Sequence, residues 1–70
     1  MPRLRDMRED ADRTQTDIAV YLGIQQTVYS RYERGFQTIP LEHLIRLADY
    51  YNVSLDYLTG RTNIQALRKK

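Results

Sequence analysis

The feature that most constrains this chain is a glycine, Gly23, that stands between two short helical patterns. Apolar side chains recur at spacings of three and four on both sides of it, namely Ile18, Ala19 and Leu22 before it and Tyr29 and Tyr32 after it. Such spacings place side chains on one face of an α-helix. Glycine adopts the left-handed backbone conformation at little steric cost, and this conformation ends a helix and reverses the chain. The stretch 14–35 therefore predicts two short helices joined by a tight turn.

The start of the first of these helices is marked by a capping pattern. The hydroxyl of Thr14 can accept a hydrogen bond from the backbone of Asp17, and the Asp17 carboxylate can accept one from the backbone of Thr14. We therefore expect a helix over residues 15–22. The second helix is expected over about residues 25–33, but Gln25 marks its start less clearly, because glutamine is a poorer cap than serine, threonine or aspartate.

Three further segments have helical patterns. Residues 3–11 have apolar positions at helical spacing and charged residues between them. Pro40 suits the first turn of a helix, and the stripe that follows it is the most regular in the chain. This stripe consists of Leu41, Leu44, Leu47, Ala48 and Tyr51. Ser54 can cap a last, short helix that ends at Gly60.

Several side chains outside these stripes are assigned from their positions. In the loop before the fourth helix, either Phe36 or Ile39 is expected to pack against the core. Three of the six tyrosines are expected to pack in the core, namely Tyr29, Tyr32 and Tyr51. The other three are either partly buried or exposed toward a partner, namely Tyr21, Tyr50 and Tyr57. His43 is expected at the surface, and Glu33 is expected to form an ion pair with Arg8 that fixes the second helix of the motif.

Composition excludes several classes of protein. The 70 residues include no cysteine and one histidine, which rules out a disulfide framework, a thiolate metal site and a histidine cluster. No apolar run approaches the roughly 18 residues that cross a bilayer, and the chain begins with charged sequence rather than a signal peptide, so we expect a soluble, cytoplasmic protein. No pair of titratable groups is spaced for acid–base chemistry. We therefore expect neither an enzyme nor a site for a metal, a cofactor or a small-molecule substrate.

The net charge of +2 is unevenly distributed. Residues 61–70 contain four basic side chains and no acidic one, so residues 1–60 contain seven basic and nine acidic side chains. Bulk charge therefore does not indicate a nucleic-acid partner, and only the local placement of arginines can.

An ordered set of residues between positions 3 and 60 matches one known pattern. It consists of Leu4, Arg8, Thr14-Gln15, Ile18-Ala19, Leu22-Gly23-Ile24, Gln26, Ser30-Arg31-Tyr32-Glu33, Gly35, Ile39-Pro40-Leu41-Glu42, Leu47-Ala48-Asp49-Tyr50-Tyr51 and Asn52-Val53-Ser54-Leu55-Asp56-Tyr57-Leu58. On these residues the chain resembles the helix-turn-helix DNA-binding domain of the phage repressor and Cro type, the XRE family. The resemblance implies an all-α fold, a five-helix repressor-like bundle containing a helix-turn-helix. The DNA-binding domain would occupy residues 1–60, followed by a basic tail or helix extension at 61–70.

The same resemblance implies which side chains contact DNA. The candidates for base contacts are Gln26, Thr27, Ser30 and Arg31. The candidates for phosphate contacts are Gln15, Arg13 and Arg34. Two alternatives remain open, because Arg31 can instead pair with Glu33 or a neighbouring acidic residue on the surface, and Arg34 can instead satisfy carbonyls at the helix end. Arg13 stands where the family usually has an apolar residue, so it either loosens the start of the helix or adds a phosphate contact.

The implied function is a sequence-specific, double-stranded DNA-binding transcriptional regulator. It would act as a repressor, as a homodimer on a palindromic operator, with residues 55–67 as the expected dimer surface. The alternative is a protein-interaction module of the same fold, such as an antitoxin-like or anti-repressor partner. The acidic balance of residues 1–60 and three apolar side chains favour this alternative, namely Val28, Phe36 and Ile39.

Overall fold

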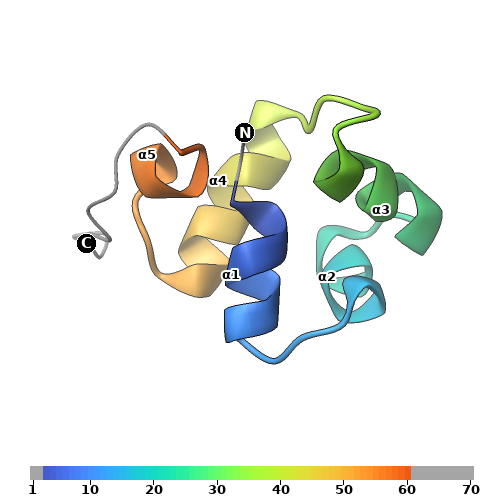
Figure 1. Ribbon diagram of the computed structural model, residues 1–70, viewed down its shortest axis with the longest axis horizontal. Helices are drawn as coiled ribbons and strands as arrows, with labels where there is room; N and C mark the ends of the chain where they lie inside the picture. The colour runs from blue at the N-terminus through green and yellow to red at the C-terminus, as the bar shows by residue number, and fades with distance from the viewer. Residues whose placement is uncertain (1–2, 61–70) are drawn as a thin grey trace.

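The computed structural model describes residues 3–60, which form five α-helices and, within that range, no strand (Figure 1). The helices are α1 (Leu4–Asp10), α2 (Gln15–Leu22), α3 (Gln26–Arg34), α4 (Leu41–Tyr51) and α5 (Leu55–Leu58). The predicted five-helix fold is therefore confirmed. The predicted basic tail at 61–70, and the part of the expected dimer surface beyond residue 60, lie outside the described residues.

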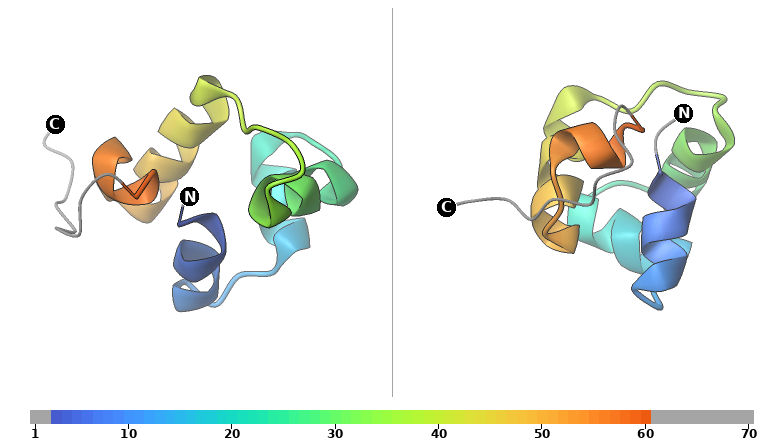
Figure 2. Two further views of the ribbon diagram at one scale, coloured as in Figure 1. Left: turned by 45° about the horizontal axis from the view of Figure 1, so that its top comes forward. Right: turned by 60° about the vertical axis from the view of Figure 1, so that its left-hand side comes forward.

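The helices are arranged as two neighbouring pairs with α1 beside both. Helices α2 and α3 lie side by side, as do α4 and α5, and the two pairs are on opposite sides of the molecule (Figures 1 and 2). No helix within residues 3–60 is long and apolar enough to cross a membrane.

A single core joins the five helices. Its most deeply buried side chains are Tyr29, Leu4, Ile18, Leu47, Leu58 and Val53. Every helix contributes at least one of them or of their buried neighbours, so each amphipathic pattern in the sequence corresponds to a buried face. Since an isolated helix of eight or nine residues is unstable in water, α2 and α3 depend on this burial.

The loop after α3 resolves one of the open alternatives. Ile39 packs in the core, with 7% of its surface exposed, whereas Phe36 is 70% exposed. The prediction that the apolar stripe of α4 begins at Leu41 is wrong, because Leu41 is 61% exposed. Pro40 is the residue before the helix rather than part of its first turn, and the face of α4 that packs against the core begins at Leu44.

The ends of α2 are those that the sequence predicts. The backbone N–H of Asp17 donates to Thr14 Oγ1 at 3.1 Å, and the backbone N–H of Thr14 donates to Asp17 Oδ2 at 2.9 Å, which completes the capping box. These hydrogen bonds hold the pKa of the Asp17 carboxyl below its ordinary value. Gly23 ends the helix with a φ of 74°. Helix α3 begins after Gln25, whose side chain makes no capping hydrogen bond.

Candidate nucleic-acid interface

Helix α3 has one buried side and one exposed side. On the buried side, Tyr29 is fully buried and Tyr32 is 8% exposed. On the opposite side five side chains line a shared shallow hollow, namely Gln26, Thr27, Ser30, Arg31 and Arg34. We call these five residues the outer face of α3. The structure thus brings together all four candidates for base contacts and one candidate for a phosphate contact.

Most of the outer face has no role in holding the bundle together. Within residues 3–60, the side chains of Thr27, Ser30 and Arg31 make no hydrogen bond or ion pair. The alternative in which Arg31 pairs with Glu33 does not occur, because Glu33 is bound by Arg8 instead. These hydroxyl and guanidinium groups are therefore available for contacts with another molecule.

Gln26 is the exception, because it is held from α2. Its Nε2 donates to Gln15 Oε1 at 2.6 Å, and Gln15 Nε2 donates in turn to Glu33 Oε1 at 3.1 Å. The sequence predicts different DNA contacts for these two glutamines and does not predict the bond between them. Their spacing along the chain carries no signal for it, since the contact depends on how α2 and α3 are placed by the turn.

The ion pair predicted between Arg8 and Glu33 is confirmed. Arg8 Nε lies 2.6 Å from Glu33 Oε2, and Arg8 Nη2 donates to Glu33 Oε1 at 3.2 Å. The pair is shielded, with 13% of the Arg8 side chain and 3% of the Glu33 side chain exposed. Burial opposes ionisation of Glu33, but the hydrogen bonds from Arg8, with smaller contributions from the nearby Tyr29 hydroxyl and from Gln15, outweigh it and hold the pKa of the Glu33 carboxyl below its ordinary value. A single charged carboxylate therefore ties α1, α2 and α3 together.

Two phenols lie buried near this carboxylate. The hydroxyls of Tyr29 and Tyr51 have no hydrogen-bond partner within residues 3–60. Burial raises the pKa of both phenols above the ordinary value for tyrosine, and the nearby negative charge of Glu33 adds to the effect. Both groups are therefore neutral throughout the physiological pH range.

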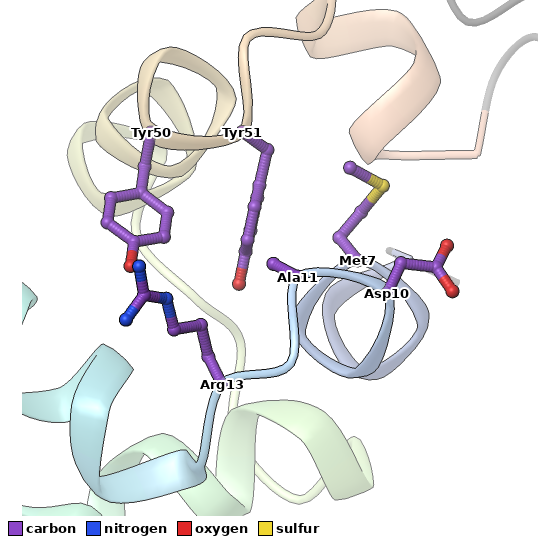
Figure 3. A pocket seen from close by; sticks show the side chains of 6 residues that line it. All are labelled: Met7, Asp10, Ala11, Arg13, Tyr50 and Tyr51. Atoms are coloured by element: carbon purple, nitrogen blue, oxygen red, sulfur yellow. The ribbon is translucent and has the colours of Figure 1, made fainter.

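Arg13 is placed apart from the outer face of α3. It lines a hollow between the ends of α1 and α4, together with Met7, Asp10, Ala11, Tyr50 and Tyr51. Its side chain extends toward the hydroxyl end of Tyr50 (Figure 3). The structure thus does not group Arg13 with the other candidates for DNA contacts.

Arg46 of α4 binds the C-terminal end of α2, a contact that the sequence does not predict. Arg46 Nη2 donates to the backbone carbonyl of Tyr21 at 2.7 Å, and Nη1 donates to that of Leu22 at 3.3 Å. Tyr21 Oη donates back to the carbonyl of Arg46 at 3.1 Å, and the guanidinium lies 5.0 Å from the Tyr21 ring centroid. Helix α2 has no basic residue in its last turn, and its last carbonyls lack partners within the helix. This absence could have indicated that a cation from another helix binds there.

The remaining aromatic residues are mostly half-buried. This is the case for the three tyrosines left open above, Tyr21, Tyr50 and Tyr57. The rings of Tyr21 and Tyr50 lie 4.6 Å apart. The prediction that His43 is a surface residue is wrong, because it is half-buried with its ring 6.3 Å from that of Tyr32. Val28 is half-buried against the core, which favours packing over a contact with a base.

Comparison with known proteins gives a consistent set of relatives. The family model described as helix-turn-helix matches residues 4–58. The chain is 37% identical over 62 residues to the HTH-type transcriptional regulator ImmR of Bacillus subtilis, a match covering 89% of this chain and 49% of ImmR. It is 37% identical over 59 residues to the cryptic phage CTXphi transcriptional repressor RstR of Vibrio cholerae, covering 84% of this chain and 53% of RstR. The HTH-type transcriptional regulator AnsR of Bacillus subtilis is 34% identical over 61 residues, covering 87% of this chain and 53% of AnsR.

The chain spans about half the length of the curated relatives that it matches. No solved structure matches it significantly.

Proposed function

Because the chain belongs to the helix-turn-helix family, we propose that it is a sequence-specific, double-stranded DNA-binding transcriptional regulator that acts as a repressor. The observation that carries the proposal is the outer face of α3. Its hydroxyls and its Arg31 guanidinium make no hydrogen bond or ion pair within residues 3–60, while the opposite side of the same helix is anchored by two buried tyrosines. An α-helix fits the major groove of B-form DNA, where such side chains distinguish base pairs.

The chemistry of each side chain suggests a role. Arg31 can donate two hydrogen bonds to a guanine edge, and Gln26 can bond an adenine edge. Gln15 holds Gln26 in one orientation, so less side-chain freedom is lost when a base is bound. Thr27 and Ser30 add a methyl group and hydroxyls that suit a thymine edge or a water-mediated contact.

Phosphate contacts would set the register. Gln15 is the first residue of α2, whose N-terminal end favours an anion. Arg34 closes the outer face of α3 at its other end. Arg13 is the least supported candidate, because its side chain extends toward Tyr50 in the hollow between α1 and α4.

We propose a homodimer on a palindromic operator. One domain of this size contacts few base pairs, so useful affinity requires two domains on half-sites about 34 Å apart. The expected dimer surface begins at Leu55, which is half-buried on α5. Repression would follow from occupation of the operator.

The test is selection of binding sites from random duplexes, followed by quantitative binding to the selected sequence. We expect the selected sequences to be palindromic and the affinity to fall steeply as the salt concentration rises. Arg31→Ala should lower affinity about 10- to 100-fold and relax the preference at one base position. Arg5→Ala removes the same charge from an exposed site on α1 and should leave sequence preference unchanged. Equal effects of the two substitutions, or no sequence preference in the wild type, would contradict the proposal.

The second candidate is a protein-interaction module of the same fold. It is favoured by exposed apolar side chains, namely Val20, Phe36, Leu41 and Ile45. In that case the binding partner would be retained when Arg31 is replaced, and lost when Leu41 or Val20 is replaced by a charged residue.

A further inference from the structure

Phe36 is the largest apolar side chain left exposed in residues 3–60, and its position is fixed by the backbone. It follows Gly35, which ends α3 with a φ of 78°. The N–H of Phe36 donates to the carbonyl of Arg31 at 3.0 Å, and that of Gly35 donates to the carbonyl of Tyr32 at 3.3 Å. This pair of hydrogen bonds is the Schellman arrangement, in which the residue in the position of Phe36 usually packs an apolar side chain against the helix. Here the ring is 70% exposed instead.

Within residues 3–60, the ring stacks against a cation from the outer face of α3. The Arg34 guanidinium carbon lies 4.6 Å from the centroid of the Phe36 ring. Arg34 makes no hydrogen bond or ion pair within residues 3–60, so the alternative in which it satisfies helix-end carbonyls does not occur there. It lines the hollow of the outer face of α3 and also the adjoining hollow beside Gln15 and Glu33. The ring therefore restrains an otherwise free arginine between two polar hollows.

We propose that Phe36 is a positioning residue for DNA binding, which holds Arg34 where it meets a phosphate of the bound duplex. The inference rests on the proposed function. In helix-turn-helix complexes the first residues of the recognition helix contact bases, so the far end of α3 lies toward the backbone. An unrestrained arginine loses much of its side-chain freedom on binding, and a ring that already orders the guanidinium reduces that loss. Exposure of the ring is the condition for this role, because a ring buried in the core could not reach Arg34.

A double-mutant cycle tests this role. We compare the wild type, Phe36→Ala, Arg34→Ala and the double variant for binding to the selected duplex and to an unrelated duplex at several salt concentrations. Phe36→Ala should weaken both complexes about threefold, the size expected for loss of an exposed cation–π contact. Arg34→Ala should weaken binding more and reduce the slope of log K against log salt by about one. The double variant should bind DNA as weakly as Arg34→Ala alone, because the ring then has no guanidinium to hold.

Three controls keep the result interpretable. Phe36→Tyr retains a ring and should retain affinity, whereas Phe36→Leu should behave as Phe36→Ala. Leu41→Ala removes a comparably exposed apolar side chain and should leave affinity unchanged. The thermal midpoints of the Phe36 variants should match that of the wild type, because the ring is not part of the core.

The remaining outcomes overturn the inference in distinguishable ways. If Phe36→Ala still weakens binding when Arg34 is absent, the ring itself contacts DNA or a partner. If Phe36→Ala has no effect in the wild-type background, the ring has no part in binding. The ring-current shift on the Arg34 side-chain protons, measured by NMR without DNA, reports the stacking alone. If the protein binds DNA sequence-specifically but shows no ring-current shift, only the role of Phe36 is refuted. If the shift is present but the protein does not bind DNA sequence-specifically, both the proposed function and the role of Phe36 are refuted.

Discussion

Helices α2 and α3 are neighbours of similar length in one motif, yet they are stabilised in different ways. Both ends of α2 are defined by local groups, since the Thr14 capping box starts it and Gly23 ends it. Arg46 of α4 adds hydrogen bonds to its last carbonyls. Helix α3 has no side-chain cap at its start. It is held through its inner side, by the buried Tyr29 and by the ion pair of Glu33.

Under the proposed function, this difference follows from which side of each helix must stay free for DNA. A helix whose outer side is reserved for another molecule cannot gain stability there, so its packing energy must come from the opposite side. Both helices need burial, but local side-chain and glycine signals mark both ends of α2, whereas only the C-terminal end of α3 is marked in this way, by Gly35. We expect substitutions on the inner side of α3 to cost more than removal of the cap of α2, and three predictions test this order.

The largest effect is expected at Tyr29. Tyr29→Ala removes a fully buried aromatic ring from the centre of the core and should lower the free energy of unfolding by about 4 kcal/mol. A domain of this size has a total stability of only about 4–10 kcal/mol, so the variant should be partly or wholly unfolded at 25 °C. Urea denaturation followed by circular dichroism measures the change.

Tyr29→Phe is the matched control for this prediction. The Tyr29 hydroxyl has no hydrogen-bond partner within residues 3–60, so its removal should change stability by less than about 1 kcal/mol. A large loss in Tyr29→Phe, or a small one in Tyr29→Ala, would show that α3 is not held by the ring.

The next effect is expected at the ion pair. Glu33→Gln leaves the Arg8 guanidinium shielded without its charged partner and should cost about 3 kcal/mol, the lower end of the range for breaking a buried pair. The loss should depend on pH. Because the folded pKa of Glu33 lies below its unfolded value, the stabilisation is present above the ordinary glutamate pKa and is lost as the pH falls through the folded pKa.

Stability of the wild type and of Glu33→Gln should therefore converge as the pH falls below about 4. Arg5 and Glu9 form an exposed pair on α1, and Glu9→Gln should change stability by less than about 1 kcal/mol at any pH. Parallel pH profiles for the wild type and Glu33→Gln would contradict the assignment of the acid-sensitive stability to this carboxylate.

The smallest effect is expected at the cap of α2. Thr14→Ala removes the hydroxyl that accepts from the backbone of Asp17 and should cost about 1 kcal/mol. Thr16→Ala changes an exposed threonine inside the same helix and should be neutral or slightly stabilising, since alanine favours helix. A loss at Thr14 larger than that at Tyr29 or Glu33 would reverse the comparison between the two helices.

The same contrast explains how much the sequence could predict. The bounds of α2 follow from Thr14 and Gly23, because a hydroxyl cap and a left-handed glycine act within three or four residues of chain. The inner side of α3 follows from the spacing of its tyrosines. The pairing of Glu33 with Arg8 could also be predicted, since both lie at helix positions directed toward the bundle.

Contacts between elements could not be predicted in the same way. Arg46 reaches the end of α2 only because of the way α4 crosses it, and the bond between Gln15 and Gln26 depends on the placement of α2 against α3. In the loop after α3, the choice between Phe36 and Ile39 had no periodic pattern to decide it. The assignment of the outer face of α3 to DNA contacts stays a prediction.

Because one side of α3 packs in the core and the other side is exposed, the two sides can change independently in evolution. The side chains of Thr27, Ser30 and Arg31 make no hydrogen bond or ion pair within residues 3–60, so under the proposed function replacing them should leave folding intact while changing the preferred target. Gln26 is less free to vary, because a new side chain there would also release Gln15 and, through it, one of the bonds to Glu33. Retargeting of this scaffold, in evolution or by design, is therefore expected to proceed first through residues 27, 30 and 31, with residue 26 changing only together with residue 15.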